Sequence, residues 1–233
     1  MRPAAPEDPD RRRRRRRGAA PTGREWTVYA RSTTVLAHRE SMDRGIAMIR
    51  DEVMPAVLDM AGCIGLSMLA DRESGRCIVT SAWETREAMH DSEPMVRPLR
   101  DRAADALSGT AQVDEWEIGV LHRAHTSAPG ACTRVTWVRM DPGGMDRGLE
   151  TYRTTLLPAM GEMDGFCSAS LLMDRDEGIT VSSVTFDSAE AMAASRDFAA
   201  RLRSEAAESL GAEIVEVREF ELALAHLRVP EMV

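Results

Sequence analysis

Two side chains of this sequence could act directly on a bound molecule. His90 falls in a helical pattern, and an imidazole can take up a proton near neutral pH, so it is a candidate base. Tyr152 carries a phenol that could hydrogen-bond a polar group of a substrate. We predict both as catalytic residues, against the plainer interpretation that each has its polar group at the protein surface.

Larger and charged side chains could form the walls of a pocket around them. Those predicted to line it are Trp83, Arg97, Trp137 and Arg153. Trp83 ends a predicted strand, where a ring can form a pocket wall or simply fill the core. Arg97 lies between Pro94 and Pro98, which are predicted to interrupt a helix and leave room for an anion beside the guanidinium. Drift after a duplication would explain these prolines equally well.

The missing residue types exclude several kinds of chemistry. All 30 basic residues are arginine, and the chain contains neither lysine nor asparagine. A Schiff-base lysine, a P-loop lysine and an asparagine carboxamide are therefore excluded. The cysteines show no C-x-x-C pair and no clustering with histidine, so we predict free thiols in a reducing cytoplasm and no metal site; they are Cys63, Cys77, Cys132 and Cys167.

Charge is distributed unevenly along the chain. Residues 1–25 hold nine arginines and four acidic residues, whereas the remainder holds 21 arginines and 34 acidic residues. The first 25 residues, rich in arginine and proline, have little to bury and are predicted to be a disordered leader. The acidic remainder argues against nucleic acid as a partner. The longest uncharged apolar run, 60–70, is shorter than the roughly 18 residues that a membrane helix needs.

The clearest pattern is an internal repeat. Residues 42–92 align without a gap to residues 145–195 at an offset of 103, with 18 of 51 positions identical. A repeat of this length indicates two copies of one domain, because solenoid repeats run to roughly 20–50 residues. At this offset Tyr152 replaces Ile49, and His90 corresponds to Ala193.

Each copy is predicted to fold as strand, helix, strand, strand, helix and strand. In the first copy these elements fall at 27–37, 41–62, 63–70, 76–83, 85–107 and 112–121. In the second they fall at 132–140, 145–163, a hairpin over 166–186, 188–210 and 213–225. The first helix of the first copy is expected to kink or end at Pro55.

This order is that of a ferredoxin-like βαββαβ unit. Helices on one face of such a sheet leave the other face bare, and a second sheet is its simplest cover. We therefore predict an α+β protein in which two ferredoxin-like repeats form an intramolecular dimeric α+β barrel. The domains are expected at 26–123 and 131–228, joined by a linker at 124–130.

Two motifs within this order point to a known family. The run Leu-Pro-Ala-Met-x-x-Met-Asp-Gly-Phe at 157–166 and the segment Ser-Ala-Trp-Glu-Thr-x-Glu-Ala-Met at 81–89 resemble antibiotic biosynthesis monooxygenase (ABM) domains, here in tandem. The resemblance covers residues 27–227. It implies a pocket between sheet and helices in each half.

The resemblance also implies several activities. ABM-like enzymes oxidise polycyclic aromatic compounds with oxygen and no cofactor, or bind and degrade haem, while other members isomerise small molecules. The haem-degrading members rely on a first-strand asparagine, where this chain has Thr33 and Thr136, and on a helix histidine that the aligned stretches 95–99 and 197–201 do not offer. The sequence therefore disfavours haem degradation.

From this we expect a small-molecule-binding protein that acts as a cofactor-independent monooxygenase of an aromatic substrate. The alternative is a non-catalytic ligand-binding or stress-associated barrel; an isomerase would need a carboxylate facing His90. No cofactor and no metal are expected. A small aromatic molecule is the expected partner, nucleic acid and membranes are not, the cytoplasm is the expected location, and further homo-oligomerisation stays open.

Overall fold

The computed structural model describes residues 27–227 and 231–232, which include the predicted strands and helices. The predicted leader, residues 1–25, lies outside the described residues. Within the described part of the chain, no helix combines the length and the apolar character needed to cross a membrane.

The two halves run through the same order of elements. The first half contains β1 (Val28–Leu36), η1 (Arg39–Ser41), α2 (Met42–Met48), η2 (Ile49–Val53), α3 (Met54–Leu58), β2 (Cys63–Ala70), β3 (Arg76–Trp83), α4 (Arg86–Asp91), α5 (Glu93–Leu107) and β4 (Ala111–Arg123). The second half contains β5 (Cys132–Arg139), η3 (Pro142–Gly144), α6 (Met145–Thr151), η4 (Tyr152–Leu156), α7 (Leu157–Gly161), β6 (Phe166–Asp174), β7 (Ile179–Phe186), α8 (Ala189–Ala194), α9 (Arg196–Leu210) and β8 (Glu213–Leu227). Each half is thus a βαββαβ unit.

The strands close into one barrel in the order β1, β3, β2, β8, β5, β7, β6, β4 and back to β1. The last strand of each half makes this closure. β4 pairs with β1 of its own half and with β6 of the other half, and β8 pairs with β5 and β2 in the same way. The predicted fold class, an intramolecular α+β barrel of two ferredoxin-like repeats, is confirmed.

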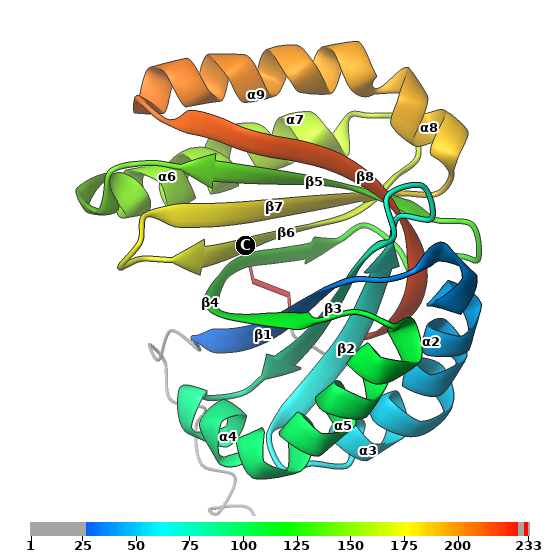
Figure 1. The fold of residues 1–233 in the computed structure, drawn as a ribbon. Helices are drawn as coiled ribbons and strands as arrows, with labels where there is room; N and C mark the ends of the chain where they lie inside the picture. The colour runs from blue at the N-terminus through cyan, green and yellow to red at the C-terminus, as the bar shows by residue number, and fades with distance from the viewer. Residues whose placement is uncertain (1–26, 228–230, 233) are drawn as a thin grey trace, which may run out of the picture.

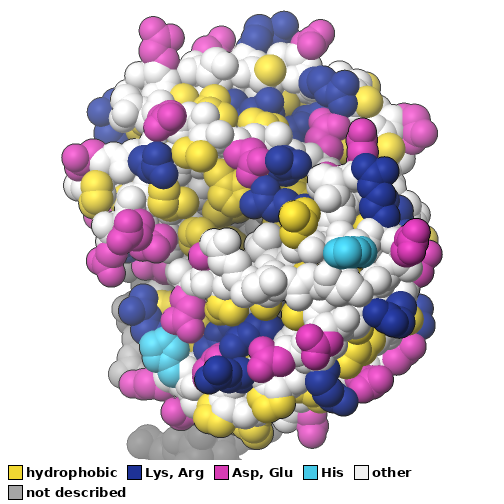
Figure 2. Space-filling model, viewed as in Figure 1, with side chains coloured by type: hydrophobic (Ala, Val, Ile, Leu, Met, Phe, Trp, Pro, Cys, Tyr) yellow, Lys and Arg dark blue, Asp and Glu magenta, His cyan; other side chains and the backbone are white. Residues whose placement is uncertain are grey.

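The helices cover the outside of the barrel in two layers. Figure 1 shows α2 to α5 on one side and α6 to α9 on the opposite side. One apolar cluster lies under each layer, around Trp83 and Leu107 in the first half and around Phe186 in the second. Another fills part of the barrel interior around Val135 and Phe220. On the face shown in Figure 2, acidic and basic side chains are interspersed and apolar side chains lie between them.

The first helix of each half widens into a π-helical turn just before its proline and does not end there. Pro55 has no N–H to donate to the carbonyl four residues back, and the five residues before α3 form the π-helical turn η2. Pro158 follows the π-helical turn η4 in the same way. The kink expected at Pro55 is therefore a π-helical turn that precedes it.

The second helix of each half is broken at a serine. The sequence predicts that Pro94 and Pro98 interrupt this helix in the first half, and that Asp197 and Arg201 at the matching positions leave it continuous in the second. The second part of this prediction is wrong, because α4 and α5 meet at Ser92 while α8 and α9 meet at Ser195. Helix α5 continues through Pro98, whose side chain is exposed. At each break the serine hydroxyl and a buried arginine both donate to the carbonyl of the methionine three residues earlier, Met89 in the first half and Met192 in the second.

Candidate functional site

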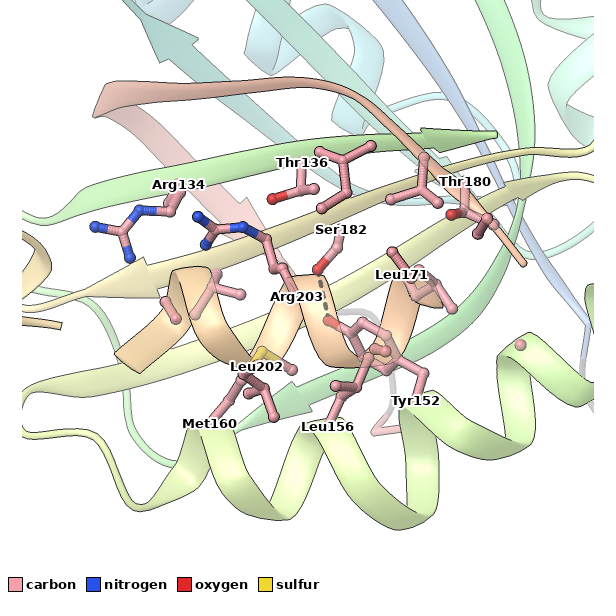
Figure 3. Close-up of a pocket in the computed structure, with 18 of the residues that line it drawn as sticks. Arg134, Thr136, Tyr152, Leu156, Met160, Leu171, Thr180, Ser182, Leu202 and Arg203 are labelled. Atoms are coloured by element: carbon pink, nitrogen blue, oxygen red, sulfur yellow. Dashed lines mark hydrogen bonds between the residues drawn. The ribbon is translucent and has the colours of Figure 1, made fainter. Parts of the chain in front are cut away.

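The second-half cavity lies between the sheet and the helices of the second half. Its volume is about 100 Å³, and it is lined by side chains from β5, β6 and β7, from η4 and α7, and from α9. Most of these side chains are apolar, among them Leu156, Met160 and Leu202. Tyr152 and Ser182 lie in the middle, and Arg134 and Arg203 lie toward one end (Figure 3). The arrangement provides an apolar space with a few hydrogen-bonding groups.

Tyr152 is placed in the cavity by the π-helical turn η4, where it is the first residue. Its side chain is buried, its hydroxyl lies 2.9 Å from Ser182 Oγ, and it donates to the carbonyl oxygen of Ser170 at 3.3 Å. Burial raises the pKa of Tyr152, which the Ser182 hydrogen bond only partly offsets. The phenol is therefore protonated at neutral pH and acts as a hydrogen-bond donor, not as a base.

Arg134 fixes one end of the cavity from β5. Its side chain is 3% exposed, and its guanidinium donates to Ser195 Oγ at 2.9 Å, to the Met192 carbonyl at 2.5 Å and to Glu219 at 2.9 Å. These bonds join β5, the first strand of the second half, to the end of α8. A buried charge of this kind requires a counterion and full hydrogen bonding.

The first half contains the same arrangement. Arg31 is 2% exposed and donates to Ser92 Oγ at 3.2 Å, to the Met89 carbonyl at 2.8 Å and to Glu115 at 3.2 Å. Our sequence analysis missed both arginines. The signal was present, because Arg31 and Arg134 are related by the repeat offset and the aligned block ends at the two serines.

Arg203 reaches the second-half cavity from α9. Partial burial lowers its pKa, and the neighbouring charge of Arg134 lowers it further. Among the described residues, no carboxylate forms an ion pair with its guanidinium. Arg203 therefore lies at the wall of an apolar cavity, and Glu219 acts on it only through space.

A larger cavity lies inside the barrel. It has a volume of about 490 Å³ and opens near the linker between the two halves. Its walls carry many small hydroxyl side chains, including Ser67, Thr80, Ser170, Ser183 and Thr185. We did not predict this cavity, although Ser67 and Ser170 are identical repeat positions.

The fold also brings together three side chains that could hold a metal ion. The donor atoms of His125, Cys167 and Asp187 lie within 4.8 Å of one another. His125 Nε2 already lies 2.7 Å from Asp187 Oδ1, which explains both groups as a surface ion pair. The sequence spacing gave no sign of this cluster, because each residue comes from a different loop or strand.

The two residues predicted to be catalytic lie far apart. Tyr152 lines the second-half cavity, whereas His90 lies on α4 of the first half and is 53% exposed. His90 Nε2 lies 2.8 Å from Glu115, the carboxylate that also binds Arg31. The structure therefore does not bring His90 and Tyr152 to one site, and a catalytic role for either stays a prediction.

The residues predicted to line a pocket also lie elsewhere. Trp83 is fully buried in the first-half core and donates from Nε1 to Ser81. Trp137 points into the barrel, where it contacts Phe220 edge to face.

The two predicted arginines have other surroundings as well. Arg97 is exposed on α5. Arg153 donates to the Gly119 carbonyl at 2.9 Å, beside the second-half cavity but not among its lining residues. Adjacent residues of a helix face different directions, which explains why Arg153 leaves the cavity that Tyr152 enters.

The fold and the site together define a single-chain α+β barrel of the ferredoxin-like class with a mostly apolar cavity in its second half. Two proteins of Mycobacterium tuberculosis strain H37Rv, the uncharacterized proteins Rv2557 and Rv2558, are both 56% identical to this chain. The alignments span 208 residues (89% of this chain, 93% of Rv2557) and 218 residues (93% of this chain, 92% of Rv2558). The chain belongs to the family of these mycobacterial proteins. No family model matches it.

Solved structures share the fold at low sequence identity. A provisionally assigned monooxygenase from Fusobacterium nucleatum is 9% identical with a TM-score of 0.67, covering 88% of this chain and 96% of its own. An anthrone oxidase-like protein is 14% identical with a TM-score of 0.62, covering 88% and 94%. A ferredoxin-fold protein of Listeria monocytogenes related to antibiotic biosynthesis monooxygenases is 7% identical with a TM-score of 0.52, covering 84% and 95%. At these identities the likeness concerns the fold.

Proposed function

We propose that the protein is an ABM-like small-molecule-binding protein that uses the second-half cavity, and that it oxidises a small aromatic substrate with molecular oxygen and no cofactor. The observation that carries the proposal is the buried Tyr152 hydroxyl, paired with Ser182 inside an apolar cavity. Fold relatives described as monooxygenases, or as anthrone oxidase-like, support the type of reaction.

The proposed reaction requires the cavity to hold the substrate as an anion next to molecular oxygen. An electron-rich ring CH₂ group and O₂ give a ring carbonyl and one water, so that the substrate supplies all the electrons and both hydrogens. A protonated Tyr152 stabilises a developing phenolate oxygen by donating a hydrogen bond, and the apolar walls strengthen that bond by excluding water. Since Tyr152 is not a base, the substrate must be acidic enough to bind as its anion.

Oxygen uptake with a panel of hydroxylated aromatic compounds tests this proposal. Uptake that persists with a metal chelator and falls at least about tenfold in Tyr152→Phe is the expected result, since one buried donor to an oxyanion contributes roughly 10²–10³ in rate. The control is Tyr29→Phe, because Tyr29 is the other tyrosine of the chain and lies in the first half. The proposal fails if no compound supports uptake or if both variants behave alike.

The alternative is a barrel that binds a ligand without transforming it. The cavity volume does not separate the two functions, because about 100 Å³ is below the roughly 300 Å³ of typical ligand pockets and limits a substrate and an unreacted ligand alike to a small size. Saturable binding to the second-half cavity without oxygen uptake would identify the non-catalytic function.

A further inference from the structure

The two halves differ at one charged position beside their cavities. The first half has Glu93 at the start of α5, where the second half has Arg196 at the start of α9. Glu93 accepts from Arg100 at 2.6 Å and pairs with Arg31 at 3.2 Å. Both arginines line the first-half cavity, which is only about 40 Å³. The first half therefore supplies a carboxylate to its own cavity arginines.

The second half has no such carboxylate. Arg203 occupies the repeat position of Arg100. Arg196, at the repeat position of Glu93, forms an ion pair with Glu219 at 2.8 Å. Glu219 also binds Arg134, so one carboxylate serves two arginines. Asp197, the neighbour of Arg196, acts on Arg196 only through space.

The two halves therefore differ in whether the cavity arginine on the second helix has a carboxylate partner. In the first half, two arginines (Arg31 and Arg100) meet two glutamates (Glu93 and Glu115). In the second half, two arginines (Arg134 and Arg196) share one glutamate, Glu219, and Arg203 forms no ion pair with a carboxylate of the described residues. An arginine beside an apolar cavity without a counterion is a binding group for an anion.

The geometry points to a ligand that carries an ionised carboxylate. We propose that the second-half cavity binds a small apolar carboxylate whose acid group pairs with Arg203, as Glu93 pairs with Arg100 in the first half. The Glu93 carboxylate is 39% exposed, so a ligand carboxylate in the matching place lies at the mouth of the cavity. Its hydrocarbon part packs against Leu202 and Met160 and points toward Tyr152 (Figure 3).

This inference rests on the proposed function only in using the same cavity. It concerns the chemical class of the ligand and holds with or without oxidation. A cavity of about 100 Å³ is smaller than the 150 Å³ cavity known to bind benzene, so a probe can have no more than one ring, with its acid group outside at the mouth.

Binding of benzoate and of benzamide, which has the same shape without the charge, tests the inference. Calorimetry on the full chain should show benzoate binding at least about tenfold more tightly than benzamide, because a charge-assisted pair is stronger than a neutral contact. Methyl-labelled methionine gives the location by NMR: benzoate should shift the signals of Met160 and Met163, which line the second-half cavity, and not that of Met54 in the first half.

Substitutions on α9 assign the effect to Arg203. Arg203→Gln should lower benzoate affinity about tenfold and leave benzamide affinity unchanged, whereas Arg203→Lys, which keeps the charge, should retain most of it. The matched control is Arg201→Gln, because Arg201 lies on the same helix and is exposed to solvent. Arg196→Glu installs the carboxylate of the first half and should weaken benzoate binding to a similar extent.

Two results overturn the inference and are distinguishable. Equal binding of benzoate and benzamide, unaffected by Arg203→Gln, removes the carboxylate assignment and leaves the proposed function in place. If neither probe binds to protein that circular dichroism shows to be folded, the carboxylate assignment is wrong. Oxygen uptake by the same preparation would then show that the proposed function still holds.

Discussion

At the scale of residues, a buried arginine in each half fixes the junction between strand and helix. Glu219 is the counterion of Arg134 and also binds Arg196. Partial burial raises the pKa of Glu219, but hydrogen bonds from the two arginines outweigh it, so its pKa lies below the ordinary value. Glu219 is therefore a group whose ionisation stabilises the folded state.

The sign of the pH dependence follows from this lowered pKa. Ionised Glu219 stabilises the fold above its unfolded-state pKa of about 4.3, and the contribution is lost as the pH falls through the lower folded-state pKa. Glu219→Gln should lower the free energy of unfolding by about 1.5–3 kcal/mol at pH 7, the range for hydrogen bonds to charged groups. The difference from the unsubstituted protein should shrink as the pH falls below about 4.

Urea unfolding between pH 3 and pH 7 measures this effect. Glu213→Gln is the matched control, because Glu213 lies on the same strand, is 70% exposed and approaches Arg139 only to 3.7 Å. A constant difference between Glu219→Gln and the unsubstituted protein across this pH range would contradict the prediction.

Part of the candidate site could be predicted from residue types alone. Tyr152 stood out because a phenol replaces the alkyl group of Ile49 in the repeat, and the structure does place it in a cavity. Arg203 did not stand out, since it is an arginine in both copies and its difference lies in the partner that it lacks. The alignment shows that the second half has Arg196 in place of Glu93, but only a structure shows which arginines Glu93 pairs with in the first half.

At the scale of elements, the hairpin of each half docks against the end of its first strand. Gly178 has φ +65°, and its carbonyl accepts from the Met140 backbone N–H at 2.9 Å. Gly75 has φ +82° and makes the same contact with Ala37 at 2.8 Å. A side chain at either glycine would collide with the backbone carbonyl of the residue it contacts. These repeated glycines are explained by the close approach.

Gly178→Ala should lower the free energy of unfolding by at least about 2 kcal/mol, from the left-handed backbone together with the collision. Gly144→Ala serves as the control, since Gly144 has φ −91° and open space around it. Thermal or urea unfolding of both variants measures the difference. Equal stabilities would show that the hairpin can move away from the strand at little cost.

The order of the elements could be predicted from the sequence, but the helix interruptions could not. Apolar spacing and turn residues gave each strand and helix of the repeat. The break at Ser92 depends on Arg31, which lies 61 residues away, so no local pattern contains it. Pro98 is tolerated because it lies on the exposed side of α5, where its ring meets solvent.

At the scale of the whole molecule, the two halves share their longest strands. β4 and β8 each pair with a strand of the other half as well as with a strand of their own half (Figure 1). Neither sheet can lose its partner without leaving a strand edge unpaired. The sequence indicated that the bare sheet faces would be covered. The pairing of β4 and β8 with strands of the other half became evident only in the structure.

This sharing predicts cooperative unfolding of the two halves. Differential scanning calorimetry should give one transition with equal calorimetric and van't Hoff enthalpies, as expected for a two-state change. Two resolved transitions would mean that the halves are independent domains with a weak contact.

Joining both copies in one polypeptide also removes the symmetry that a pair of identical subunits would impose. In a pair of identical chains, Glu93 and Arg196 could not stand at the same position, because any substitution would appear on both sides. Here the cavity arginines of the first half can pair with their own Glu93 while the second-half cavity binds a ligand. The expected stoichiometry is therefore one ligand for each barrel, whereas a barrel formed by two identical single-copy chains would bind two.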